Sequence, residues 1–333
     1  MANGSARPAL GATTRPVEKA GAFARYQLIR FQRGSKRTIE SLVTMAAPPA
    51  TLRFDLQAVA THATKLPPAP QVFGRLVAAI NDGNSSLDSM AELVRLDPAL
   101  TAQLLRVANS ALFGFRSQAS NVEEAILRVG FKEVHRIVGL CTASLVFQAD
   151  MKLYATDAEH IWGNAVATAV AMEKLVGATG GDAALAYTAG LLRSIGKMVF
   201  TRHAAPAAPP PYPNDGTPLP AWETALFGCT HAVVGGALCE FWRFPRPIVS
   251  AIRDHLRPAA NPAAGPLAHL LNLAGQICTA LDRGLPGEAT LWADDPARPE
   301  KTGLSAEQID DLTMETIVEV DRMKTMLEFI RGG

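Results

Sequence analysis

The chain has 333 residues, of which 48% are hydrophobic and 19% are charged, and its formal net charge is +1. This length and composition can fill a substantial core, which excludes a disordered or fibrous protein. The charge is unevenly spread, because residues 1–50 carry eight Arg and Lys side chains against only Glu18 and Glu40. The remainder is slightly acidic, at about −5, so we expect no direct DNA binding by the folded body.

The cysteines and apolar runs exclude further classes of protein. Cys141, Cys229, Cys239 and Cys278 are scattered and form no Cys-x-x-Cys pair, so neither a zinc knuckle nor a redox dithiol is indicated. No apolar run reaches the ~20 residues of a membrane-spanning helix, and no apolar block follows the charged start as in a signal peptide. We therefore expect a cytoplasmic protein with no membrane span and no cofactor.

Residues 1–50 are expected to form a basic, partly disordered N-terminal segment. Residues 1–14 are rich in Ala, Gly, Thr and Pro, and residues 15–45 are basic and weakly amphipathic. A solvated tail with some helix is the favoured interpretation. Docking of residues 15–45 on a partner, on an anionic surface or on the body of the chain are the alternatives.

Residues 51–150 are predicted to form a first helical lobe. Val72, Leu76 and Ile80 are spaced by four, which predicts a helix that ends at Asp82-Gly83-Asn84. A second hydrophobic stripe stops before Pro98, and a third continues to Gly114.

The end of this lobe contains two more expected helices. Ser120 and Glu123 match a capping box and start a short helix that Gly130 ends. The helix from Lys132 to Phe147 is apolar nearly all round and should be buried. No convincing strand is present.

Residues 151–333 are predicted to form a second, HD-like helical lobe with a C-terminal helix. Helices are expected over 157–176, 182–202, 220–242, 247–256 and 266–283. The stretch "APAAPPPYPNDGTP" is a loop, because proline removes backbone donors. Ser305 and Gln308 match a second capping box, which starts the final helix to Ile330. The sequence therefore predicts an all-α protein.

Residues 66–114 resemble the opening of an HDOD domain. They share the Leu-Pro-Pro-x-Pro entry, Asp97-Pro98 between two helices, and Asn109-Ser110 at the end of the third. The similarity continues through "AGLLRSIGK" and "HAVVGGALCEFWRFPRPIVSAIRDH" and covers roughly residues 55–280. It implies a multi-helix fold of two packed helical lobes, typical of bacterial signalling proteins and related to the HD metal-dependent phosphohydrolases.

The resemblance also implies a degenerate metal pocket. HD enzymes hold catalytic cations with His and Asp side chains. The first ligand position falls on Asn164, the His-Asp pair on Arg193-Ser194 and the closing aspartate on Gly275. The polar positions that remain are Lys197, His231, Asp254 and His255, and the two histidines are expected to be partly buried and bonded to backbone carbonyls. His160, one turn before Asn164, is expected to be an exposed residue at a helix start, with a substitute ligand as the alternative. We expect no metal site and no catalytic residue.

Arg193 is the most informative departure from the HD pattern. It cannot ligate a metal, because its guanidinium stays protonated and has no lone pair to offer. A fixed cation in this place is expected to hold a carboxylate, for which Asp254 and Glu240 are the candidates. The alternative is that Arg193, together with Lys197, receives an anionic ligand such as a nucleotide phosphate.

These expectations define the predicted function. The resemblance implies a non-catalytic signalling protein that acts through protein contacts with a kinase, a response regulator or a cyclic-dinucleotide enzyme. Two alternatives remain open. One is a divergent HD-type phosphodiesterase or phosphatase, and the other is a nucleotide-sensing domain that uses the remnant pocket.

Overall fold

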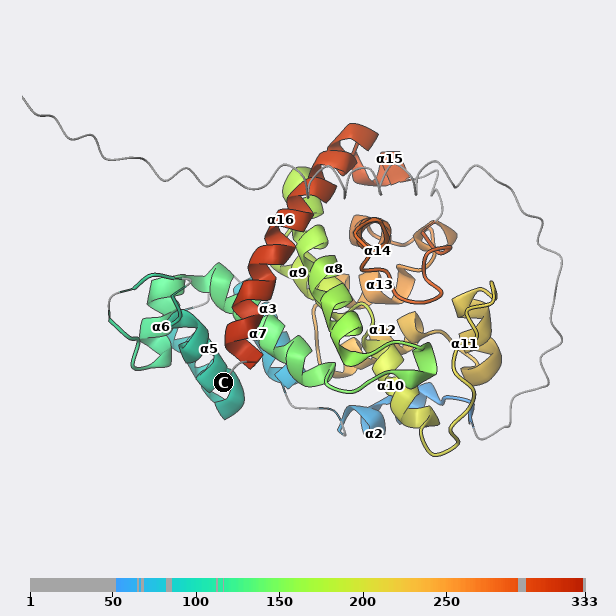
Figure 1. Ribbon diagram of the computed structural model, residues 1–333, viewed down its shortest axis with the longest axis horizontal. Helices are drawn as coiled ribbons and strands as arrows, with labels where there is room; N and C mark the ends of the chain where they lie inside the picture. The colour runs from blue at the N-terminus through green and yellow to red at the C-terminus, as the bar shows by residue number, and fades with distance from the viewer. Residues whose placement is uncertain are drawn as a thin grey trace, which may run out of the picture. The chain divides into compact units, whose positions relative to one another are not determined.

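Figure 1 shows a computed structural model of the chain. The structure describes residues 52–331, apart from 65, 67–68, 82–85, 112, 116 and 293–297. The predicted basic segment 1–50 lies outside these residues. The described part is helical and contains no β-strand, only an isolated bridge between Met151 and Thr156. The predicted all-α fold is confirmed.

The first half of the described chain forms short helices along the predicted hydrophobic stripes. After the 3-10 helix η2 (Leu56–Ala58) come α2 (Val59–Ala63), α3 (Ala69–Asn81), α4 (Leu87–Arg95), α5 (Pro98–Ala108), α6 (Val122–Val129) and α7 (Phe131–Val146). Asp97 starts α5, because its side chain accepts the backbone N–H groups of Ala99 and Leu100 at 2.9 and 3.2 Å. Most of α7 is buried, as its composition predicts.

The second half continues in helices. They are η3 (Lys152–Tyr154), α8 (Ala158–Thr179), α9 (Ala183–Leu192), α10 (Ile195–Ala204), α11 (Leu219–Phe227), α12 (His231–Phe241), α13 (Arg246–Asp254), η4 (Pro258–Ala260), α14 (Pro266–Ala280), α15 (Arg298–Thr302) and α16 (Ala306–Arg331). The proline-rich loop 205–218 forms no helix, as predicted.

Two helices predicted as continuous are broken. The predicted helix 182–202 divides into α9 and α10 at Arg193-Ser194, where no Gly or Pro marks the change of direction. The predicted helix 220–242 divides into α11 and α12. There Gly228 adopts a left-handed conformation with φ of 85° and ends α11, and the Thr230 side chain caps the start of α12.

One predicted helix cap is also corrected. Asn121, not Ser120, caps α6, because its side chain accepts the backbone N–H of Glu124 at 2.8 Å. The Glu124 carboxylate in turn accepts the backbone N–H of Ser120 at 2.9 Å, so the reciprocal pattern lies one residue later than the sequence suggested. The second predicted capping box, Ser305 with Gln308, is confirmed by reciprocal bonds of 2.9 and 3.2 Å.

The long helix α8 organises the packing. It contacts α7, α9, α14 and α16, while α16 also contacts α5, so the helices of the two halves are joined directly (Figure 1). A buried ion network crosses this junction. Arg136 of α7 donates to Glu173 of α8 at 2.6 and 2.9 Å and to Glu319 of α16 at 2.9 Å.

Within the described residues, no single helix is long and apolar enough to cross a membrane. The pair α11 and α12 passes a test of length and composition when taken together, but the two helices are bent by 68°. His231 and Glu223 of this pair are fully buried and bonded to each other. The two helices are therefore apolar because they lie in the core of the fold.

Close approach of α10 to α12 depends on Gly196. A Cβ atom at this position would lie 2.0 Å from the carbonyl oxygen of His231, which is backbone and cannot rotate away. We expect Gly196→Ala to destabilise the fold by about 3 kcal/mol, as measured by urea unfolding. Gly177→Ala is the matched control, because that helical glycine faces open space and its replacement should stabilise by about 0.5–1 kcal/mol. Equal effects of the two substitutions would contradict this account.

Candidate functional site

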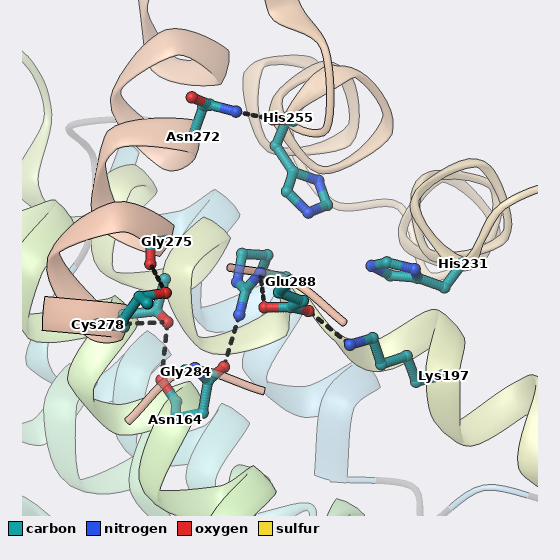
Figure 2. A network of polar contacts seen from close by, with 12 residues as sticks. Asn164, Lys197, His231, His255, Asn272, Gly275, Cys278, Gly284 and Glu288 are labelled. Carbon is teal, nitrogen blue, oxygen red and sulfur yellow. Dashed lines mark hydrogen bonds and ion pairs between the residues drawn. The ribbon is translucent and has the colours of Figure 1, made fainter. Parts of the chain in front are cut away.

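The predicted site residues come from six helices. Asn164 lies on α8, Arg193 and Ser194 at the α9–α10 junction, Lys197 on α10, His231 at the start of α12, Asp254 and His255 at the end of α13, and Gly275 on α14. The structure brings Asn164, Arg193, Lys197, His231 and His255 together in one buried polar cluster, which we call the pocket after its counterpart in the HD enzymes. At its centre is a residue that the sequence did not single out, Glu288 (Figure 2).

Glu288 is bonded to both cations of the pocket. Arg193 donates from Nη1 to Glu288 Oε2 at 2.9 Å, and Lys197 donates from Nζ to Glu288 Oε1 at 2.5 Å. The second terminal nitrogen of Arg193 donates to Asn164 Oδ1 at 2.6 Å. The side chains of all three charged residues are only 1% exposed, so the carboxylate and the two cations are removed from water together.

The predicted partners of Arg193 were therefore wrong. Glu240 is exposed, and the half-buried Asp254 has its carboxylate 3.6 Å from Nε of Arg253. Glu288 was missed because it lies in the loop after α14, where no helical periodicity indicates which side chains face inward. Its one signal is composition, since it is the only acidic residue between Asp282 and Asp294 and stands in the apolar stretch "GLPGEATLW".

The pKa values of Glu288 and Lys197 depend on two opposing effects, burial and the charges of neighbouring residues. Burial works to raise the pKa of Glu288, but the charges of Arg193 and Lys197 outweigh it and lower that pKa to about 2. Burial lowers the pKa of Lys197, and the Glu288 carboxylate opposes this effect. Glu288 is thus ionised at neutral pH, and Arg193 supplies a permanent countercharge.

The two predicted histidines are held in fixed orientations. The Nδ1 atom of His231 lies 2.8 and 2.9 Å from the oxygens of Glu223, which also accepts the hydroxyl of Tyr154 at 2.7 Å. His255 donates from Nδ1 to the carbonyl of Ile252 at 2.7 Å, and burial, followed by the charge of Arg193, moves its pKa well below the ordinary value. His255 is therefore neutral at neutral pH.

The far nitrogen of each imidazole has no partner among the described residues. Nε2 of His231 and Nε2 of His255 are both buried without a hydrogen bond to any of them, and the two ring centroids are 5.8 Å apart. Because His255 is neutral and donates from Nδ1, its Nε2 presents a lone pair to the pocket. Both rings point toward the side of the pocket where Glu288 lies (Figure 2).

Gly275 makes room for a tryptophan. A Cβ atom at this position would lie 2.6 Å from Cε2 of Trp292, which is fully buried. The indole ring stacks on His255 at 6.2 Å between centroids, and the guanidinium of Arg193 lies 5.2 Å from its centre. An indole therefore fills the wall of the pocket where the HD pattern expects an aspartate.

His160 lies in the first turn of α8, as expected, although it is half-buried and not exposed. Its Nε2 bonds the carbonyl of Gly284 at 2.8 Å, so the alternative role as a substitute ligand is wrong. One turn later Asn164 donates from Nδ2 to the carbonyl of Arg283 at 2.6 Å, and both residues hold the start of the loop that carries Glu288. Ser194 is buried, and its hydroxyl has no hydrogen-bond partner among the described residues.

The residues of the pocket do not fit a catalytic metal ion. Among the described residues, no group of three or more His, Cys, Asp or Glu side chains is placed to hold one. The guanidinium of Arg193 stands at the predicted ligand position, and the one carboxylate nearby is already bonded to two cations. We therefore derive no step that uses a metal.

The all-helical fold and the pocket between its helices define a domain of the HD-like class. A family model for the HDOD domain matches residues 66–258, more than half of the chain, and the chain belongs to the HDOD family.

Solved structures share this fold at low sequence identity. An HDOD domain protein of unknown function from Geobacter sulfurreducens is 21% identical, with a TM-score of 0.58 over 83% of this chain and 99% of that one. A protein from Marinobacter aquaeolei VT8, inferred to act in signal transduction, is 21% identical, with a TM-score of 0.62 over 94% of this chain and 66% of that one. A protein from Shewanella amazonensis SB2B, inferred to be a phosphohydrolase, is 24% identical, with a TM-score of 0.55 over 79% and 98%.

A curated relative is an uncharacterised protein of Treponema pallidum (strain Nichols). It is 29% identical over 246 residues, which are 69% of this chain and 45% of the relative. The chain thus spans less than half the length of that protein.

The charge of Glu288 should make the stability of the protein depend on pH in a defined window. Because folding lowers its pKa from 4.5 to about 2, its contribution is complete above pH 4.5 and is lost as the pH falls toward 2. The contribution is on the order of 3 kcal/mol. Glu288→Gln should cost about 3–5 kcal/mol at pH 7, because it leaves two buried cations unpaired.

Urea unfolding at several pH values checks this prediction. The difference between wild type and Glu288→Gln should shrink as the pH falls below 4.5. Glu300→Gln is the control, because that side chain is 81% exposed and its removal should change little at any pH. A difference that stays constant from pH 7 to pH 3 would show that the carboxylate is not the source of the effect.

Proposed function

We propose that this HDOD chain is a non-catalytic component of signal transduction that acts through contacts with other proteins. The observation that carries the proposal is the ion group of Arg193, Lys197 and Glu288. Hydrolysis of a phosphate ester in an HD pocket needs a cation with an open coordination position. Here a guanidinium and its carboxylate occupy that place and are closed off from water.

The signalling role draws support from the family and one relative in fold. The HDOD match covers residues 66–258, and the Marinobacter protein of the same fold is itself inferred to act in signal transduction. Kinases, response regulators and cyclic-dinucleotide enzymes are the partner classes we propose, because a domain without chemistry of its own must pass a signal by binding. Residues 15–45 are the candidate contact element and lie outside the described residues.

A divergent phosphohydrolase is the second candidate function. It is favoured by the Nε2 atoms of His231 and His255, which are buried and have no hydrogen-bond partner among the described residues. Two nitrogen ligands are fewer than the three or more protein ligands that catalytic metal sites normally use. The neighbouring charge of Arg193 further disfavours a cation.

A metal and activity assay separates the two candidates. Protein purified without chelators should contain much less than one Mn, Fe or Zn per chain by plasma mass spectrometry. It should also not hydrolyse bis(p-nitrophenyl) phosphate above the buffer rate in the presence of these metals. A near-stoichiometric metal that disappears in His231→Ala, together with hydrolysis, would refute the non-catalytic proposal.

Affinity purification tests the role in protein contacts. The tagged full chain, expressed in its native host, should co-purify with a signalling protein identified by mass spectrometry. A chain that lacks residues 1–45 should recover at least tenfold less of the same partner if the basic segment makes the contact. Equal recovery would assign the contact to the folded body instead, and the absence of any signalling protein in both samples would count against the proposal.

A further inference from the structure

Glu288 behaves as an anion that the pocket has bound. Its two oxygens are each taken by a different cation, Arg193 at 2.9 Å and Lys197 at 2.5 Å. The other buried carboxylate nearby, Glu223, is engaged by His231 and Tyr154. Glu288 is the carboxylate that pairs with both cations, so its removal alone would leave two buried positive charges unpaired, which calls for an anion.

The carboxylate does not satisfy the pocket completely. Among the described residues, the Trp292 indole N–H and the Nε2 atoms of His231 and His255 are buried and have no hydrogen-bond partner. Buried polar groups are normally paired, so three unpaired ones around a single ion group need an explanation. One of them, His255 Nε2, is an acceptor because Nδ1 carries the hydrogen of this neutral ring, and a carboxylate without a proton has nothing to donate to it.

Glu288 also reaches the cations from a loop and not from the packed helices. Its own backbone makes local turn bonds, from Glu288 N–H to the carbonyl of Leu285 at 3.1 Å and from Leu291 N–H to the carbonyl of Glu288 at 2.8 Å. Arg193 and Lys197, by contrast, are fixed on either side of the α9–α10 junction. The two cations of the pocket are thus placed by the packed helices α9 and α10, and the carboxylate is placed by the loop after α14.

We propose that Arg193 and Lys197 form an oxyanion-binding site that Glu288 occupies as a tethered ligand, and that the matching external ligand is a phosphate group carrying a P–OH. The phosphate oxygens accept from Arg193 and Lys197. The P–OH donates to the lone pair of His255 Nε2, which the carboxylate cannot do. No bond is broken, so this binding is additional to the proposed signalling function and does not depend on the identity of its partner.

Glu288→Ala opens the site by removing a group equal in size and charge to acetate. Thermal unfolding of this variant is followed in inorganic phosphate, sulfate and acetate, at constant ionic strength and with a chelator present. Phosphate should raise the midpoint by about 5 °C or more, because a ligand that binds only the folded state stabilises it. Sulfate, which accepts but does not donate at neutral pH, should raise it less.

Two controls correct for the general effect of these salts on folded proteins. Wild type should respond weakly, because its tethered carboxylate competes at a high effective concentration. Glu288→Gln should also respond weakly, because the amide keeps the volume of the side chain and the site stays filled. A response in Glu288→Ala that is no larger than in these two proteins would overturn the proposal.

Two further outcomes test the choice of phosphate as the ligand and cover the case in which Glu288→Ala does not fold. Rescue of Glu288→Ala by acetate but not by phosphate would overturn the phosphate assignment and leave Glu288 as a structural carboxylate. If Glu288→Ala does not fold, Glu288→Asp replaces it, because a carboxylate one methylene shorter competes less well and phosphate should stabilise this variant more than wild type. Equal responses would overturn the proposal. Because the chelator removes metal ions, these results do not depend on whether the protein is non-catalytic. That proposal is tested separately, by bound metal and by hydrolysis.

Discussion

The buried contact of Glu288 with Arg193 and Lys197 is the interaction on which the rest of the site depends. Two cations and a carboxylate that are 1% exposed have lost nearly all their hydration, and only their mutual attraction and hydrogen bonds offset that loss. Each partner therefore requires the other. The loop after α14 must close over the pocket, because only then does Glu288 reach the α9–α10 junction.

The departures from the HD pattern form one consistent set when their contacts are considered. Gly275 removes a carboxylate from α14 and leaves the space in which the Trp292 ring lies against His255. Glu288, four residues before Trp292 in the same loop, supplies a carboxylate to the pocket in place of one on α14. Arg193 takes the place of a ligand and supplies the charge that the returned carboxylate needs. An internal ion group of Arg193, Lys197 and Glu288 thus stands where the resemblance to the HD enzymes places metal ligands.

The sequence predicted the helices well and the loop poorly, for a physical reason. Hydrophobic spacing reports which face of a helix is buried, so the stripe through Val72 and Leu76 and the apolar α7 were assigned correctly. It does not report a break such as the one at Arg193-Ser194, where the apolar pattern continues from α9 into α10. It also cannot place a loop side chain. Glu288 comes 95 positions after Arg193, and only the fold brings them together.

Stability alone does not explain why the pocket stays polar. Replacing a buried ion group by apolar side chains of similar volume is often neutral or stabilising, so a pocket selected only as core has no need of Arg193, Lys197 and Glu288. A core would also not leave Nε2 of His255 without a donor among the described residues. Groups that are costly to bury and incompletely paired occur preferentially at functional sites. The proposed oxyanion site accounts for their arrangement around a carboxylate carried by a loop, and a purely structural core does not.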